Sequence, residues 1–239
     1  MKKGIIIIGT DTGVGKTKIT TALLELCNQK NFLSKRYGGM KPIETGIMPT
    51  EPEESDAILI KKAAKMDESL DMICLYSFRY PLAPVLAAEK ENNLIQIDTI
   101  KKAFNTLSQK YDVLFVELAG GLLVPLNHTQ TNLDLLKTLD LPFLLVSKNV
   151  LGGINHILLT LSVLKNELID FHQRCIGVIL NNITAVDSIV KKTNGELIRK
   201  FTSVPVLSSA PYDNTFDNRY IKTFLKTFVL PELSKKLSL

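Results

Sequence analysis

Residues 9–17 have the sequence Gly-Thr-Asp-Thr-Gly-Val-Gly-Lys-Thr, and four isoleucine residues, 5–8, stand directly before them. The isoleucine run contains no polar residue, which predicts a strand buried on both faces. A helical pattern of apolar residues begins at Lys16 and includes Ile19, Leu23 and Leu26. A glycine-rich turn between a buried strand and a helix is typical of a phosphate-binding loop, whose backbone N–H groups point at the phosphates of a nucleotide. Five residues separate Gly9 from Gly15, so this is the longer form of the loop.

The loop predicts roles for its last two residues. Lys16 is expected to bridge the outer phosphates, and the Thr17 hydroxyl is expected to ligate Mg²⁺. Because Mg²⁺ needs several oxygen ligands, a carboxylate should lie near the loop in addition to the Thr17 hydroxyl. Glu117 follows the predicted strand 112–116 and is expected at its carboxyl end, where ligands bind in parallel sheets. Asp56 begins a predicted helix, either as an ordinary first-turn acid or as a carboxylate near the metal.

Lys41 is a further candidate, within Gly-Gly-Met-Lys-Pro-Ile-Glu-Thr-Gly at residues 38–46. Pro42 keeps the preceding residue out of helical geometry, so Lys41 is expected where a strand ends and a loop begins. The glycines on both sides favour close approach to a ligand, and a solvated lysine is the alternative.

Other apolar runs alternate with helical patterns, which predicts parallel strands joined by crossover helices. We therefore expect one α/β domain over residues 1–239, with a mostly parallel sheet and helices on both faces. The segment 46–54 is predicted to be the most mobile loop, and the amphipathic stretch 224–239 a helix that packs on the domain. The other predicted strands are 113–116, 143–146, 176–180 and, more weakly, 204–207; the predicted helices are 16–30, 97–110 and 154–168.

The composition is that of a globular protein: 45% of the 239 residues are hydrophobic and 22% are charged. A formal net charge of +5 suits an anionic small molecule as well as nucleic acid, and does not separate the two. Cys27, Cys74 and Cys175 are far apart and form no CxxC pair, which favours reduced thiols in a cytoplasm. No apolar stretch approaches the ~20 residues of a membrane span, so we expect a soluble protein.

Several motifs follow one another along the chain: GTDTGVGKT (9–17), KPIETG (41–46), SDA (55–57), VELAGGLLVPL (116–126), LGGINH (151–156), GVILNN (177–182) and the Ala-Pro-Tyr turn at 210–212. In this order they resemble the motifs of the dethiobiotin synthetase family. The resemblance implies a phosphate-loop (P-loop) NTPase fold and an ATP- and Mg²⁺-dependent cyclo-ligase. Its substrates would be 7,8-diaminopelargonate and CO₂, and it would be a cytoplasmic homodimer with no nucleic-acid or membrane partner.

The resemblance also implies a role for individual residues. Lys41 would be the catalytic lysine beside Lys16, and Thr45 would contact the substrate. Gly153, Ile154 and Asn155, at the start of a helix, would receive the substrate carboxylate across the dimer interface. Thr17, Asp56 and Glu117 would bind Mg²⁺. The implied ATP-binding residues are Thr12, Gly13, Val14, Gly15, Lys16, Thr17, Lys18, Asp56, Glu117, Leu118, Ala119, Gly120, Asn181 and Asn182 at the adenine edge, and Pro211, Tyr212 and Asp213 near the base and ribose.

The chain departs from the family pattern at three places. Gly13 stands where many members have Glu, and Ser208-Ser209-Ala210 replaces a Gly-acid-Ile sequence. Leu118 stands where Gly is usual, and is expected to crowd the γ-phosphate and the metal. A switch of the partitioning and division-site ATPase type is the alternative function, although those proteins carry a lysine early in the loop where this chain has Asp11. A cobyrinate-type amidoligase would need a glutaminase domain, for which 239 residues leave no room.

Overall fold

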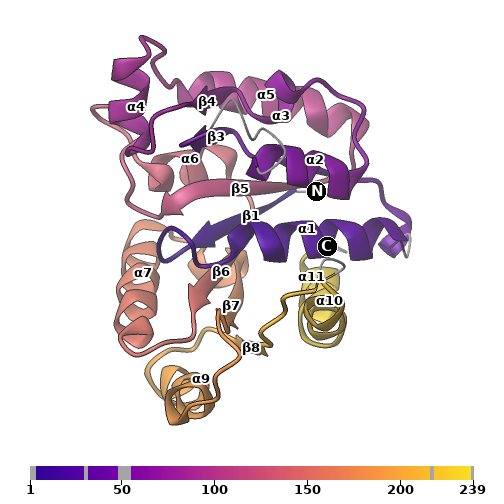
Figure 1. Ribbon diagram of the computed structural model, residues 1–239, viewed down its shortest axis with the longest axis vertical. Helices are drawn as coiled ribbons and strands as arrows, with labels where there is room; N and C mark the ends of the chain where they lie inside the picture. The colour runs from indigo at the N-terminus through magenta and orange to yellow at the C-terminus, as the bar shows by residue number, and fades with distance from the viewer. Residues whose placement is uncertain (1–3, 30–31, 48–54, 216–217, 238–239) are drawn as a thin grey trace.

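The computed structural model describes residues 4–29, 32–47, 55–215 and 218–237 (Figure 1). Its central sheet has six strands in the order β2-β5-β1-β6-β7-β8, and every strand pair within it is parallel. Two further strands, β3 and β4, pair in parallel beside α2 and α4. The strands are β1 Gly4–Gly9, β2 Tyr37–Met40, β3 Ile43–Thr45, β4 Tyr76–Phe78, β5 Val113–Gly121, β6 Phe143–Lys148, β7 Cys175–Asn181 and β8 Val206–Ala210.

Helices cover both faces of the sheet. On one face α1 packs between α2 and α10, and on the other α5 and α6 pack on each other and on β5, with α7 on β6 (Figure 1). The helices are α1 Lys16–Gln29, α2 Asp56–Ala64, α3 Leu70–Ile73, α4 Pro84–Lys90, α5 Ile97–Lys110, α6 Asn132–Leu139, α7 Gly153–Glu167, α8 Phe171–Arg174, α9 Ile189–Phe201, α10 Arg219–Phe224 and α11 Leu230–Leu237. The predicted fold class is confirmed.

The core forms where the predicted apolar runs lie. The four isoleucines of β1 are at most 1% exposed, because the strand lies between β5 and β6 with helices on both faces. The predicted strands at 113–116, 143–146 and 176–180 are confirmed within β5, β6 and β7. The weak run 204–207 is only half correct, since β8 begins at Val206 and continues to Ala210. The predicted helix 97–110 is α5. The predicted helices 16–30 and 154–168 are α1 and α7, and over the described residues their ends lie within one residue of the prediction.

The prediction that Glu117 lies at the end of its strand is wrong. β5 continues four residues past it to Gly121. The parallel register with β1 shifts after Ile7–Glu117 and resumes at Gly9–Gly121, so the last residue of β5 pairs with the residue that begins the phosphate loop. Glu117 is therefore a 0% exposed carboxylate inside the sheet.

The C-terminal stretch packs on the domain as expected, but it is not one regular helix. A π-helical turn, Leu225–Val229, separates α10 from α11. Pro231 has no N–H to donate to the preceding turn, which accounts for the irregularity just before it. Apolar residues of this stretch are buried, among them Leu225, Val229 and Leu233.

Of the segment expected to be the most mobile loop, residues 48–54 lie outside the described residues. Among the residues that are described, no helix combines the length and the apolar character needed to cross a membrane.

Candidate active site beside the phosphate loop

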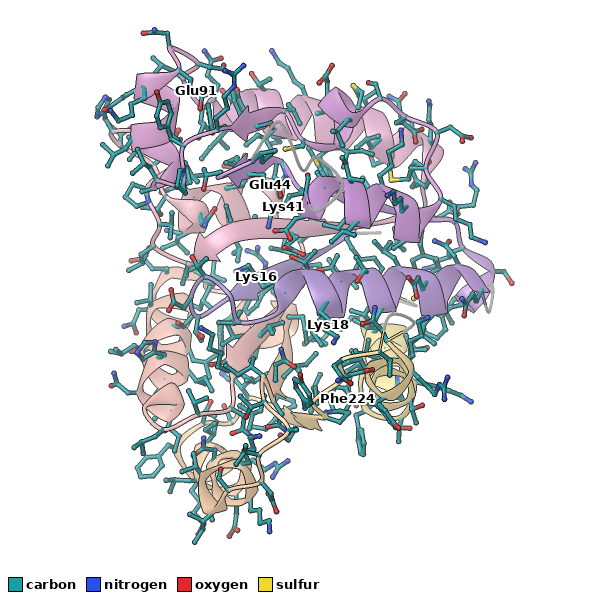
Figure 2. The ribbon with its side chains drawn as sticks, in the orientation of Figure 1. Lys16, Lys18, Lys41, Glu44, Glu91 and Phe224 are labelled. Carbon is teal, nitrogen blue, oxygen red and sulfur yellow. The ribbon has the colours of Figure 1, made fainter. Side chains whose placement is uncertain are left out.

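A cavity of about 720 Å³ opens where the phosphate loop meets the carboxyl end of β5. Four segments far apart in the sequence meet there: the loop, the segment around Lys41, the first turn of α2, and the end of β5. Lys16, Lys41 and Glu44 lie close together in the middle of the molecule (Figure 2). The lining residues are Thr12, Gly13, Gly15, Lys16, Thr17, Lys41, Glu44, Thr45, Asp56, Pro81, Leu82, Ala83, Pro84, Glu117, Ala119, Gly120 and Val124.

The loop depends on two glycines with positive φ. Gly13 has φ +67° and Gly15 has φ +88°, a region that residues with a Cβ rarely adopt. A Cβ on Gly15 would also stand 2.2 Å from Nδ2 of Asn181. The turn therefore brings the loop against the end of β7, where Asn181 Nδ2 donates a hydrogen bond to the Val14 carbonyl (2.9 Å).

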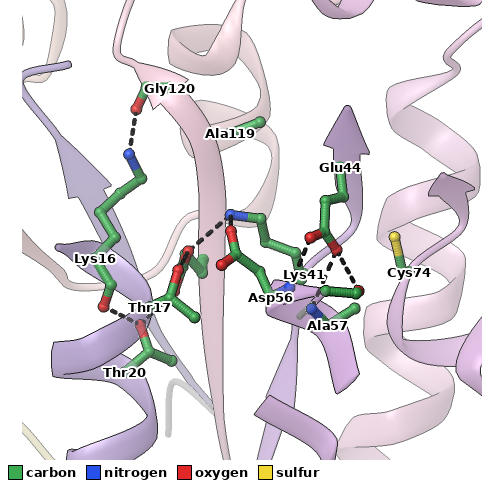
Figure 3. A network of polar contacts seen from close by, with 12 residues as sticks. Lys16, Thr17, Thr20, Lys41, Glu44, Asp56, Ala57, Cys74, Ala119 and Gly120 are labelled. Carbon is green, nitrogen blue, oxygen red and sulfur yellow. Dashed lines mark hydrogen bonds and ion pairs between the residues drawn. The ribbon is translucent and has the colours of Figure 1, made fainter. Parts of the chain in front are cut away.

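Lys41 is buried between two carboxylates at the base of the cavity (Figure 3). Its Nζ lies 2.7 Å from Glu117 Oε1 and 2.8 Å from Asp56 Oδ2, and the residue is 4% exposed. Burial alone would lower the pKa of Lys41, but the charges of Glu117 and Asp56 outweigh it and hold the pKa above its usual value. Burial likewise opposes the ionisation of Asp56, and Lys41 outweighs it, so the pKa of Asp56 is lowered. The lysine is thus a fixed ammonium group.

Glu117 has two further donors on α1. Thr17 Oγ1 donates to Oε1 (2.8 Å) and Thr20 Oγ1 donates to Oε2 (2.6 Å). With Lys41, these hydroxyls satisfy both oxygens of the buried carboxylate, which lowers the cost of burying its charge. Thr20 was not among the predicted residues. Its position three residues after Thr17, on the same face of α1, is the signal that could have found it.

Lys16 reaches back across the loop. Its Nζ donates to the backbone carbonyls of Asp11 (3.0 Å) and Gly120 (2.9 Å), which links the loop to the end of β5. Burial and the nearby charge of Lys41 lower the pKa of Lys16 to about 8. Two lysines with different environments therefore flank the place expected for the phosphates.

A divalent cation could be bound by the side-chain oxygen atoms of Thr17, Asp56 and Glu117. Within the part of the chain that the structure describes, no cluster of three or more His, Cys, Asp or Glu side chains could hold a metal by itself. Two carboxylates and a hydroxyl meet around Lys41, and all are hard oxygen donors. Mg²⁺ prefers such donors and keeps several positions for water or phosphate oxygens. The residues present therefore fit Mg²⁺ bound together with a nucleotide.

The structure does not bring every predicted residue to this cavity. Leu118 packs in the hydrophobic core at 2% exposure, so the prediction that its side chain crowds the γ-phosphate is wrong. Neighbouring side chains alternate along a strand, and Leu118 is directed away from the side that Glu117 faces. Val14 is also buried, and Lys18 lines a separate cavity between α1, α2 and α10.

The residues predicted for the adenine and ribose lie at the ends of β7 and β8. Asn182 Oδ1 accepts hydrogen bonds from Asn149 Nδ2 (3.0 Å) and Ser209 Oγ (3.3 Å). The Asp213 carboxylate accepts N–H bonds from Tyr220 (2.8 Å) and Ile221 (3.0 Å), and so caps α10. Pro211 and Tyr212 stand between these two groups in the chain, and Tyr212 is 39% exposed.

The start of α7 lies apart from the main cavity. Gly153 lines a pocket of about 180 Å³ with Thr10, Lys148 and His156, on the other side of the loop. Ile154 and Asn155 follow in the first turn of the helix, and Asn155 is exposed. Of the residues predicted for the substrate, Thr45 lines the main cavity. The apolar wall formed by Pro81, Leu82, Ala83, Pro84 and Val124 was not predicted, because its residues carry no motif.

Comparisons with known proteins agree on both family and fold. A family described as AAA domain matches residues 3–219. The ATP-dependent dethiobiotin synthetase BioD of Thermodesulfovibrio yellowstonii is 41% identical over 224 residues, 89% of this chain and 90% of that protein. The protein of the same name from Methanocaldococcus jannaschii is 37% identical, covering 85% of this chain and 91% of its own.

Solved structures with similar folds are more distant in sequence. The Pyrococcus furiosus cell division ATPase MinD aligns with a TM-score of 0.57 at 15% identity, over 98% of this chain and 99% of its own. A ParA family ATPase from Chlorobium tepidum aligns with a TM-score of 0.56 at 15% identity, over 99% and 97%. At such identity these two structures support the fold alone.

Proposed function

The chain belongs to the ATP-dependent dethiobiotin synthetase family, and from that membership we propose that the cavity around Lys41 is its active site. The enzyme is a ligase that makes dethiobiotin from 7,8-diaminopelargonate and CO₂ with ATP. The observation that carries the assignment of the site is the buried Lys41 ammonium, held between Asp56 and Glu117 next to the phosphate loop.

The reaction has three steps. One amine of the substrate adds to CO₂ and loses a proton, which gives a carbamate. A carbamate oxygen attacks the γ-phosphorus of ATP, ADP leaves, and a carbamic-phosphoric anhydride forms. The second amine then attacks the carbonyl carbon and loses a proton, inorganic phosphate leaves and the cyclic urea closes. Positioning and neutralisation of developing charge are what these steps require of the protein.

The lysines meet that requirement from fixed positions. Residues 13–18 would cradle the ATP phosphates, with Lys16 on the outer ones. Lys41 would hold the carbamate oxygen and offset negative charge as the phosphoryl group moves. Because Asp56 and Glu117 already hold its Nζ, Lys41 needs no reorganisation during the reaction.

Mg²⁺ would be held by Thr17, Asp56 and Glu117. When bound, it supplies positive charge that neutralises the phosphates of ATP. Thr20 would keep the Glu117 carboxylate in place from the side of α1.

The rest of the cavity suits the remainder of the substrate. The apolar wall from Pro81 to Pro84, with Val124, would pack along the alkyl chain of the diamine. Thr45 lines the same space and would contact a polar end of the substrate. Asn181 and Asn182 would bind the adenine edge, with Pro211, Tyr212 and Asp213 near the base and ribose.

We also propose that the enzyme acts as a homodimer in the cytoplasm. Asn155 and Leu159 lie one turn apart on α7, and Leu159 is 59% exposed. Leu151, just before the helix, is 87% exposed. An apolar surface beside the helix N-terminus would allow a second chain to place its own α7 start at the substrate carboxylate.

The test is product formation. Purified protein with 7,8-diaminopelargonate, bicarbonate and MgATP is expected to yield dethiobiotin, ADP and phosphate in equal amounts. No dethiobiotin with any nucleotide would overturn the function.

Replacing Lys41 tests the site. Lys41→Ala is expected to lose most turnover, because the carbamate and the transferring phosphoryl group lose their cation, while nucleotide binding is retained. Calorimetric titration with ADP and the product assay separate the two effects. Lys101→Ala, which removes an exposed lysine of α5, is the control. Full activity in Lys41→Ala would remove this residue from the mechanism.

A further inference from the structure

Glu44 is a buried carboxylate that the mechanism above does not use. It lies on β3, three residues after Lys41, and is 8% exposed. Its oxygens accept hydrogen bonds from the backbone N–H of Asp56 (2.6 Å), the backbone N–H of Ala57 (3.1 Å) and the Ser55 hydroxyl (2.9 Å) (Figure 3). All three donors belong to the start of α2.

These bonds supply the cap that α2 lacks locally. Ser55 occupies the N-cap position, yet its side chain accepts no hydrogen bond from the helix. Its hydroxyl instead donates to Glu44, which bonds two of the free N–H groups of the first turn. A carboxylate there also interacts favourably with the positive end of the helix dipole.

The capping carboxylate is held on a paired strand. Ile43 pairs with Tyr76 and Thr45 with Phe78, so Glu44 lies between two residues in register with β4. The Ile47 N–H donates to the Phe78 carbonyl (3.0 Å) and continues the pairing. The cap therefore has a defined position relative to the main chain at Lys41.

One short segment thus holds Asp56 at two points. Lys41 Nζ binds the Asp56 side chain (2.8 Å), and Glu44 accepts from the Asp56 backbone N–H (2.6 Å). A shift of the first turn of α2 would move the Asp56 carboxylate away from Lys41 and Glu117. We propose that Glu44 is a positioning residue, which fixes the main chain of Asp56 so that its carboxylate stays at Lys41 and at the cation of the working site. This inference rests on the proposed function of the cavity.

The charge of the cavity agrees with that role. Two ammonium groups, Lys16 and Lys41, face three carboxylates, Glu44, Asp56 and Glu117. The excess negative charge favours a further cation in the cavity. A neutral residue in place of Glu44 could cap α2, but it would add no negative charge to the cavity.

A double-mutant cycle tests the proposal. The variants are Glu44→Gln, Asp56→Asn and the two together. Ser188→Ala is the matched control, because the Ser188 hydroxyl caps α9 by accepting the Lys191 N–H (3.3 Å), away from the cavity. Two readouts are taken: kcat and KM for dethiobiotin formation, and the calorimetric affinity for ADP with and without Mg²⁺. Thermal midpoints show that each variant is folded.

Glu44→Gln is expected to lower kcat roughly 10- to 100-fold, with a smaller change in KM for the diamine. It should also reduce the gain in ADP affinity that Mg²⁺ brings, as Asp56→Asn does. If Glu44 acts through Asp56, the double variant loses no more than the worse single variant. Ser188→Ala should lower the thermal midpoint and leave both readouts unchanged.

Multiplied losses in the double variant would overturn the proposal, as would a wild-type kcat and Mg²⁺ response in Glu44→Gln. If the wild-type protein made no dethiobiotin, the proposed function would fail. The double-mutant cycle measured by ADP affinity with and without Mg²⁺ would still decide the role of Glu44. Should Glu44→Gln not fold, Ser55→Ala removes one donor to Glu44 and is expected to weaken the Mg²⁺ response. An unchanged response there would reject the proposal.

Discussion

At the scale of single residues, the site is a group of largely buried charged side chains, and each of them contacts polar atoms that stabilise its charge. Glu117 is 0% exposed, and Lys41, Thr17 and Thr20 together satisfy its oxygens. Removing one partner of such a group leaves an uncompensated polar atom, which costs more than the bond itself contributes. The arrangement makes each residue around Glu117 matter for stability as well as for chemistry.

Thr20→Val tests this on a residue that is not expected to touch a ligand. Valine keeps the shape but removes the O–H donor to Glu117 Oε2, so the free energy of unfolding should fall by about 1–3 kcal/mol. Thr106→Val is the control, because the Thr106 hydroxyl bonds the Lys102 carbonyl one turn back on the exposed face of α5. The Thr20 hydroxyl likewise lies 2.9 Å from the carbonyl one turn back, that of Lys16. Urea unfolding measures both. Equal losses in the two variants would contradict the argument.

At the scale of elements, carboxylates that lie 7 to 13 residues before the capped N–H groups cap the two helices packed against α1. Glu44 caps α2, and Asp213 caps α10 by accepting from the N–H groups of Tyr220 and Ile221 and from Thr215. Burial alone would raise the pKa of Asp213, but these hydrogen bonds outweigh it and lower the pKa from 3.8 to about 2. The depressed pKa means that ionised Asp213 stabilises the folded state.

The stabilisation from Asp213 should depend on pH in one direction. It is fully present above pH 4 and is lost as pH falls from about 4 to about 2, because the unfolded chain binds the proton first. Asp213→Asn is expected to lower the free energy of unfolding by about 1–2 kcal/mol at pH 7, with the difference from wild type narrowing below pH 4. Urea unfolding at pH 7, 4 and 3 measures it. A difference that widened on acidification would show that the sign is wrong.

At the scale of the whole molecule, the sheet order explains why the cavity lies where it does. β1 is flanked by β5 and β6. After β1 the chain first forms β2 and β5 on one side of it, and then β6, β7 and β8 on the other side, so the order of the strands reverses at β1. Ligands of open α/β sheets bind at such a reversal, at the carboxyl ends of the strands. The start of α7 lies on the other side of the phosphate loop from the cavity. We propose that the start of α7 from a second chain supplies the contact with the substrate carboxylate.

The exposed face of α7 tests the dimer. Leu159→Lys should shift the protein from dimer to monomer in size-exclusion chromatography with light scattering, because a charge would be buried in the interface. Leu94→Lys is a matched control, since Leu94 is also 59% exposed and lies between α4 and α5. A wild-type monomer, or a dimer that survives Leu159→Lys, would contradict the proposal.

Prediction from sequence succeeded where the signal is local. The isoleucine run gave β1, the glycine pattern gave the loop, and the helix pattern gave α1 and α5. It failed where a distant partner decides, because β5 continues past Glu117 to pair with Gly9 at Gly121. Leu118 therefore lies inside the strand, where the alternation of side chains directs it into the core. Glu44 and the apolar wall at 81–84 were not predicted, because their roles come from tertiary contacts. Thr20 was not predicted either, although its spacing of three residues from Thr17 is a local signal.

The amino-acid sequence by itself determined the fold class and the candidate residues Lys16, Thr17 and Glu117, because apolar periodicity and motif spacing are properties of the chain alone. The resemblance of its motifs to a known family identified that family and favoured a functional role for Lys41 and Asp56. Only the tertiary structure decided that Lys41 is buried between Asp56 and Glu117, that Thr20 completes the bonding of Glu117, and that Glu44 caps α2. The physical reason is that a buried charge is stabilised by the groups packed around it, and those groups come from segments up to about a hundred residues apart in the sequence.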